Sequence, residues 1–184
     1  MISRFVIPAK AGIQKKLRWN PAFAGMTESN ISFIIESMKF LFITIGKDTD
    51  KNLAESVIDY TNRINRHIKT EWKIIPSSDI KKESENILKS IDSDDYVVVL
   101  DDNGKELNTM ELSQFIEKRM ISGDKRVVFV IGGAYGVGED VFVRANYIWS
   151  LSKLTFPHQL VRLILSESIY RAISVIKKEP YHHS

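Results

Sequence analysis

The chain contains no cysteine among its 184 residues and no long run of apolar residues. The absence of cysteine excludes a disulfide scaffold, a thiolate metal site and a cysteine nucleophile. A membrane-spanning helix needs roughly 18 apolar residues in succession, and no stretch of this chain approaches that length, so no membrane partner is expected. His182 and His183 are adjacent and therefore lack the usual spacing of metal ligands, so no metal is expected either.

An excess of charge of either sign is also missing over most of the chain. The formal net charge is +3, and residues 1–37 carry all of it, with five basic against two acidic residues. Residues 38–184 hold 21 residues of each sign. A neutral body excludes recognition of nucleic acid through an overall positive field, so any nucleic-acid contact has to be local. With 43% hydrophobic and 27% charged residues, the composition is that of one globular domain.

Residues 1–37 lack the apolar periodicity of a folded domain. Residues 8–14 return in imperfect form as residues 21–27, a repeat of thirteen residues that is too short and too rich in proline and glycine to stack. The pattern resembles the translation of a mobile palindromic repeat found in some bacterial genomes. We therefore expect residues 1–37 to be a poorly ordered, repeat-derived N-terminal extension, and residues 38–184 to form the domain.

From Met38 onward, apolar runs with the composition of strands alternate with segments that repeat apolar residues at the helical period. The expected strands are residues 39–45, 72–75, 96–100, 126–131 and 147–151. Helices are expected after the turn at 46–50, after a cap at Ser77 or Ser78, near Thr109 and at Pro157, and residues 101–104 have the composition of a turn. The alternation predicts an α/β fold, a single domain with a mostly parallel sheet flanked by helices.

The strand at 126–131 is followed by four glycines, at positions 132, 133, 136 and 138. Such a loop allows positive φ angles and lets a ligand approach bare backbone. It is not a dinucleotide fingerprint, because Val141 stands where the third glycine belongs, and it is not a P-loop, because Glu139 stands where the lysine belongs. Neither of these two phosphate-binding motifs is therefore present. A ligand of a different class is expected at the carboxyl ends of the parallel strands.

Four segments in the second half of the chain occur in the order and at the spacing of a known family. They are residues 129–136 (FVIGGAYG), 149–162 (WSLSKLTFPHQLVR), 167–172 (ESIYRA) and 181–182 (YH). With residues 44–46 (TIG) near the first strand, they resemble the RlmH family. These proteins are SPOUT-superfamily methyltransferases that modify a pseudouridine in large-subunit ribosomal RNA. The similarity runs from about Met38 to the end of the chain.

The resemblance implies a fold and partners that composition and periodicity do not reveal. The implied fold is the SPOUT-type α/β knot, with a trefoil knot in the C-terminal half, which general folding rules would exclude because knots are rare. The implied cofactor is S-adenosylmethionine. An obligate homodimer and a cytoplasmic enzyme that acts on ribosomal RNA in the assembled ribosome are implied as well.

The resemblance also implies the residues that contact the cofactor. Carried over by position, they are Leu100, Gly132, Leu151, Ser152, Lys153, Leu154, Thr155 and Phe156. An adenine ring needs an apolar slot with backbone donors and acceptors at its edge, and the segment 151–156 offers both. The plainer interpretations are core packing for Leu100, a tight turn for Gly132 and a solvated side chain for Lys153.

Four residues are candidates for the catalytic site. Tyr181 and His182 form a terminal tail with a phenol and an imidazole, which the resemblance implies in the RNA site. His158 and Arg162 are four residues apart on one helix face, where they can hold a phosphate or a second subunit. A helix cap or a packing contact would explain His158 equally well.

The expected reaction is transfer of a methyl group from S-adenosylmethionine to N3 of a pseudouridine. Two alternatives remain open at this stage. One is a SPOUT methyltransferase that acts on a different RNA base. The other is a non-catalytic RNA-binding module that keeps the fold without the activity.

Overall fold

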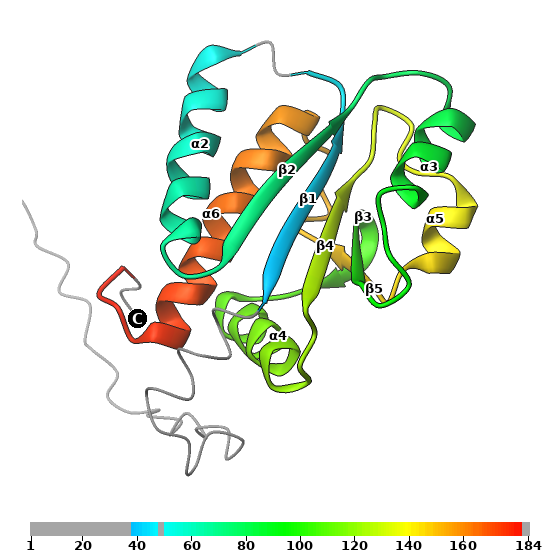
Figure 1. The fold of residues 1–184 in the computed structure, drawn as a ribbon. Coiled ribbons are helices and arrows are strands. Elements are labelled where there is room, and N and C mark those ends of the chain that lie inside the picture. The colour runs from blue at the N-terminus through cyan, green and yellow to red at the C-terminus, as the bar shows by residue number, and fades with distance from the viewer. Residues whose placement is uncertain (1–37, 48–49, 182–184) are drawn as a thin grey trace, which may run out of the picture.

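The computed structural model describes residues 38–47 and 50–181, so the expected extension at residues 1–37 and the predicted site residue His182 lie outside the described residues. The described chain forms a five-stranded sheet in the order β2-β1-β4-β3-β5 (Figure 1). The strands are β1 (Lys39–Ile45), β2 (Lys69–Ile75), β3 (Tyr96–Glu106), β4 (Arg126–Ile131) and β5 (Tyr147–Ser150). Every pairing between neighbours is parallel, which confirms the predicted α/β fold.

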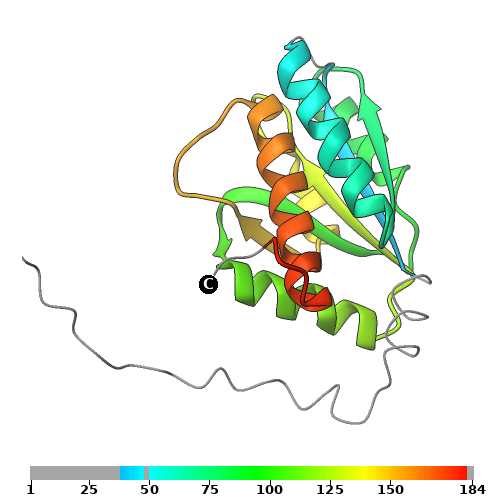
Figure 2. The same ribbon diagram turned by 90° about the vertical axis from the view of Figure 1, so that its left-hand side faces the viewer.

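Helices cover both faces of the sheet. They are α2 (Lys51–Asn65), α3 (Ile80–Leu88), α4 (Thr109–Ile121), α5 (Glu139–Arg144) and α6 (His158–Lys177). Helices α2, α4 and α6 lie together on one face, where α6 contacts both of the others (Figures 1 and 2). Helices α3 and α5 lie on the opposite face. The arrangement is the three-layer solution expected when a parallel sheet has two apolar faces.

The alternation of side chains along β1 shows why its sequence is mostly apolar. Phe40 and Phe42 join the core under α4 and α6, while Leu41 and Ile43 join the core on the face of α3 and α5. Successive side chains of a strand point to opposite faces. When helices cover both faces, both sets of side chains are buried and most of them are apolar. Burial of each such large side chain contributes about 1.5–3 kcal/mol relative to exposure.

The start of α3 differs from the prediction. Its cap is Asp79 and not Ser77 or Ser78, since the Asp79 carboxylate accepts a hydrogen bond from the Lys82 amide at 3.0 Å. All three residue types satisfy free amides at a helix N-terminus, so composition alone does not choose among neighbours.

Strand β3 also differs, because it continues through the residues that had the composition of a turn. Leu100 and Lys105 are both paired with Trp149 of β5, so the intervening residues bulge out and the chain then resumes its ladder. Gly104 allows this return, because a Cβ there would lie 2.7 Å from the carbonyl carbon of Trp149. The bulge places Asp101 and Asp102 beside the carboxyl end of the sheet. Strand β2 likewise begins at Lys69, three residues before the predicted start.

Among the described residues, no helix is long and apolar enough to cross a membrane, and no group of three acidic, histidine or cysteine side chains is placed to hold a metal. The trefoil knot stays a prediction.

Candidate active site

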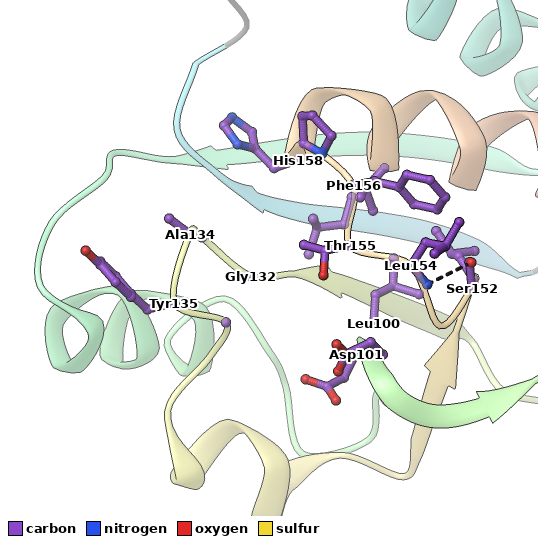
Figure 3. Close-up of a pocket in the computed structure, with 17 residues that line it drawn as sticks. Leu100, Asp101, Gly132, Ala134, Tyr135, Ser152, Leu154, Thr155, Phe156 and His158 are labelled. Carbon is purple, nitrogen blue, oxygen red and sulfur yellow. Dashed lines mark hydrogen bonds between the residues drawn. The ribbon is translucent and has the colours of Figure 1, made fainter.

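A pocket of about 690 Å³ opens beside the bulge of β3 and the carboxyl end of β4 (Figure 3). Three segments line it: the middle of β3 where the bulge begins, the glycine loop after β4, and the linker from β5 to α6. The lining comprises residues 100–102, 131–136, 151–152 and 154–158, together with Val161. The position is the one that parallel sheets use for ligands.

The glycine loop is a tight turn whose backbone forms one wall of the pocket. Gly133 and Gly136 exchange two hydrogen bonds, with N–O distances of 3.2 and 3.1 Å, and Gly136 has a φ of +76°. The neighbouring Gly132 does not have a positive φ. It is constrained instead by crowding, because a Cβ at Gly132 would lie 2.6 Å from the carbonyl carbon and oxygen of Gly136.

The far end of the same loop is attached to α3. The Gly138 amide donates to the Ser84 hydroxyl at 2.9 Å, and a Cβ at Gly138 would meet that hydroxyl at 2.5 Å. Gly133 packs against Ile45 of β1 and the carboxylate of Glu83. The turn is thus held by contacts with two other elements, α3 and β1.

The linker from β5 to α6 forms the opposite wall. The Ser150 hydroxyl donates to the Ser152 carbonyl at 3.0 Å, and the Ser152 hydroxyl accepts from the Leu154 amide at 3.0 Å. Figure 3 shows Leu154, Thr155 and Phe156 following this turn around the pocket. The linker therefore supplies apolar side chains and backbone polar groups together.

Lys153 is the one predicted cofactor residue that does not line the pocket. Its ammonium group donates to the carbonyls of Asp102 at 2.6 Å and Gly104 at 3.1 Å. Lys153 therefore ties the linker to the β3 bulge and helps to fix the separation of the two segments. The other seven predicted cofactor residues are all in the lining.

Charge distinguishes this pocket from a phosphate site. Among the lining residues, Asp101 and Asp102 are acidic and no lysine or arginine is present. Both carboxylates accept hydrogen bonds from the Asn103 side chain, at 3.0 and 2.9 Å. The expected cofactor S-adenosylmethionine carries a sulfonium and an ammonium against one carboxylate, so its net charge is positive and complementary to this lining. Sequence reasoning missed both residues; their place directly after a buried parallel strand was the available signal.

His158 begins α6 and lines the pocket. Its Nε2 atom is buried and has no hydrogen-bond partner among the described residues. The atom faces the backbone of the turn after β1, since a Cβ at Gly46 would lie 3.7 Å from it. Of the three predicted catalytic residues within residues 38–181, His158 is the one that lines the pocket.

Arg162 lies one helical turn further on, but it does not reach the pocket. It is 1% exposed and donates to the Thr44 hydroxyl at 2.9 Å and to the carbonyls of Ile45 at 2.9 Å and Gly46 at 2.6 Å. A guanidinium held in this way positions the end of β1 and does not present itself to a phosphate or a second subunit. The joint catalytic role of His158 and Arg162 stays a prediction, in which Arg162 acts from behind the end of β1.

Tyr181 lies against α2 and α6, away from the pocket of its own chain. Its hydroxyl donates to the Glu167 carboxylate at 3.2 Å and lies 3.1 Å from the Tyr60 hydroxyl. Burial raises the pKa of the Tyr181 phenol, and the hydrogen bond with Tyr60 and the charge of Glu167 raise it further. Glu167 follows His158 by nine residues, which is about 13 Å along a helix, so these two candidates are separated within one chain.

The sequence and fold were compared with known proteins. Residues 38–182 match the model of a family described as predicted SPOUT methyltransferase. Relatives from Christiangramia forsetii and Parabacteroides distasonis, each named ribosomal RNA large subunit methyltransferase H, are 44% identical over 158 residues, covering 79% of this chain and 99% of each relative. Among solved structures, a probable methylase family protein from Haemophilus influenzae Rd KW20 is 16% identical, with a TM-score of 0.47, over 78% of this chain and 67% of that chain.

Proposed function

The chain belongs to the SPOUT methyltransferase family, and from this membership we propose that it methylates N3 of a pseudouridine in large-subunit ribosomal RNA, with S-adenosylmethionine as the methyl donor. Relatives that are matched over 99% of their length carry the name of a large-subunit ribosomal RNA methyltransferase. Residues 1–37 precede the matched region, and we infer that they are an extension that the enzyme does not need.

The main structural support for this proposal is the pocket. Seven of the eight residues expected to contact the cofactor come from three separate segments of the chain, and they line one cavity of about 690 Å³. A cavity of this size is within the range of small-molecule and cofactor sites. The seven residues are Leu100, Gly132, Leu151, Ser152, Leu154, Thr155 and Phe156.

On the donor side, the chain binds and orients the cofactor. S-adenosylmethionine is the cofactor of the family, and when bound it supplies an electrophilic methyl group on a sulfonium. Leu100, Leu154 and Phe156 offer apolar surface to an adenine ring, and the backbone of the linker offers donors and acceptors for its edge. Asp101 and Asp102 offset the positive charge of the sulfonium and the ammonium.

On the acceptor side, N3 of the pseudouridine loses a proton as it takes the methyl group. His158 lines the pocket, and its imidazole is a candidate to accept this proton. The proposal gives the tail residues Tyr181 and His182 the roles of positioning the base and assisting the proton transfer. Tyr181 acts as a hydrogen-bond donor in this scheme, because its raised pKa keeps the phenol protonated.

The proposal includes a homodimer in the cytoplasm, acting on the assembled ribosome. Within one chain, Tyr181 docks on the middle of α6 and the pocket lies at the start of that helix. A second subunit that packs on α6 brings the tail of one chain to the pocket of the other. Leu160, Leu163 and Ile164 of α6 are only partly buried in the single chain and offer apolar surface for such packing.

Mass mapping of ribosomal RNA from cells with and without the gene tests the proposal. We expect one methylated pseudouridine of the large subunit to be lost on deletion and restored by the wild-type gene. Loss of a methyl group at another base would favour the alternative substrate. An unchanged map, combined with no binding of S-adenosylmethionine by the purified protein in calorimetry, would favour a non-catalytic RNA-binding module.

A further inference from the structure

Tyr135 is the most exposed large hydrophobic side chain of the described residues, at 91%. It stands at the tip of the glycine turn, between Gly133 and Gly136, and is part of the rim of the pocket. Figure 3 shows its ring projecting outward from the turn, away from Leu100 and Phe156. Single exposed aromatic residues are common on protein surfaces, so exposure alone does not indicate a role.

The backbone beneath Tyr135 is unusually well fixed for a surface turn. Gly133 and Gly136 exchange two hydrogen bonds, and the Gly132 backbone packs so closely on Gly136 that a single methyl group would not fit. Gly138 is tied to the hydroxyl of Ser84 on α3. The ring therefore loses little more than the rotation of its own side chain when it binds a planar partner, which lowers the entropy cost of binding.

The rim around Tyr135 suits the face of a base better than a phosphate. Leu154, which is 69% exposed, stands on the linker side of the opening, and the charged side chains of the lining are the carboxylates of Asp101 and Asp102. Carboxylates repel phosphate, whereas an aromatic ring stacks on any nucleobase. A nucleotide that enters an enzyme pocket leaves its stack, and aromatic side chains replace the lost stacking.

We propose that Tyr135 is a stacking platform for the nucleobase that flanks the methylated nucleotide. We assign the flanking base to Tyr135, and not the base to be methylated, because the ring faces out of the pocket and the methylated base has to enter it. The inference rests on the proposed function, since it takes the substrate to be RNA. It assigns to Tyr135 a share of substrate binding and no share of cofactor binding.

The test compares Tyr135→Ala, Tyr135→Phe and Tyr135→Trp with the wild-type protein, using large ribosomal subunits from cells that lack the gene. Val143→Ala is the matched control, because Val143 is 81% exposed on α5 and does not line the pocket. Three quantities are measured: kcat and KM for methyl transfer to the subunits, the affinity of the protein for the subunits without cofactor, and the Kd for S-adenosylmethionine by calorimetry.

We expect Tyr135→Ala to lower kcat/KM by roughly 5- to 150-fold, mainly through KM, which corresponds to the 1–3 kcal/mol that one stacked base contributes. Tyr135→Phe and Tyr135→Trp should retain most of the wild-type value, and the Kd for S-adenosylmethionine should not change. An unchanged kcat/KM in Tyr135→Ala, or a Kd for the cofactor that rises in parallel, would overturn the inference. So would failure of Tyr135→Phe to restore the rate, because the hydroxyl and not the ring would then matter.

A different set of results is expected if the proposed function itself is wrong. The wild-type protein then transfers no methyl group to the subunits, and the affinity of the protein for the subunits tests whether Tyr135 stacks on a base. Weaker binding of Tyr135→Ala to the subunits, with Val143→Ala unchanged, would support the stacking role without the methylation. Equal affinity of both variants would reject it.

Discussion

A single methyl group at Gly132 tests whether the glycine turn builds the pocket. In Gly132→Ala, the new Cβ would lie 2.6 Å from the carbonyl carbon and oxygen of Gly136. Carbon atoms in contact are separated by about 3.5–4.0 Å, so the two backbone segments have to move apart by about 1 Å. Such a movement breaks the hydrogen bonds between Gly133 and Gly136, which are already 3.2 and 3.1 Å long.

The expected magnitude follows from these contacts. Two backbone hydrogen bonds contribute about 1–3 kcal/mol together, and that is the expected loss in the free energy of unfolding. Because the turn is one wall of the pocket, a displacement of this size should also raise the Kd for S-adenosylmethionine by at least tenfold, or about 1.4 kcal/mol. Chemical denaturation measures the first quantity and calorimetry the second.

Gly123→Ala is the matched control. Gly123 has a φ of +75° after α4, and a Cβ there would meet nothing within 4 Å, so this change introduces backbone strain without crowding. The strain costs about 1–2 kcal/mol of stability and should leave the Kd for S-adenosylmethionine unchanged. The reasoning would be refuted if Gly132→Ala bound the cofactor with wild-type affinity, or if both variants weakened binding equally.

Three further predictions concern charged and titrating groups. Arg162→Met should lower the free energy of unfolding in urea by about 3–5 kcal/mol, because it leaves carbonyls at the end of β1 without their donor; a loss below about 1 kcal/mol would contradict the buried role. Asp101→Asn should raise the Kd for S-adenosylmethionine about three- to tenfold in calorimetry and leave that for S-adenosylhomocysteine, which lacks the sulfonium charge, nearly unchanged; parallel weakening of both ligands would count against the charge argument. The raised pKa of Tyr181 means that the folded state holds this proton more tightly than the unfolded chain, so its stabilisation is complete below about pH 10 and is lost above it. Denaturation between pH 9 and 11 should therefore show a steeper loss of stability in the wild type than in Tyr181→Phe, and equal slopes would exclude the linkage.

The sheet was predictable because its strands are covered on both faces. The runs at β1 and β4 are apolar at most positions, and such runs indicate buried parallel strands when helices alternate with them. The residues at 101–104 were not predictable in the same way. Polar residues with a glycine indicate a turn, and only the pairing with β5 reveals that they form a bulge within a longer strand.

The sequence located the backbone segments that line the pocket, but not the surroundings of two of its side chains. The glycine loop and the linker were recognisable because their spacing is characteristic of a family. The burial of Arg162 was not predictable, because helix periodicity puts it on the face of His158 but does not say that the end of β1 covers that face. The contacts of Lys153 were not predictable for a related reason, since a long side chain is able to turn toward backbone carbonyls of a distant strand.

The position of β4 between β1 and β3 has a consequence for folding of the chain during its synthesis on the ribosome. Until residue 131 has been synthesised and released from the exit tunnel, β1 has a partner only on the side of β2, and β3 has no partner on either edge because β5 also follows β4 in the chain. Pairings between residues that are far apart along the chain form slowly, so this interval of exposure is an intrinsic part of folding. Nascent chains that end before β4 are therefore expected to bind chaperones or aggregate, and chains that include it are expected to escape both.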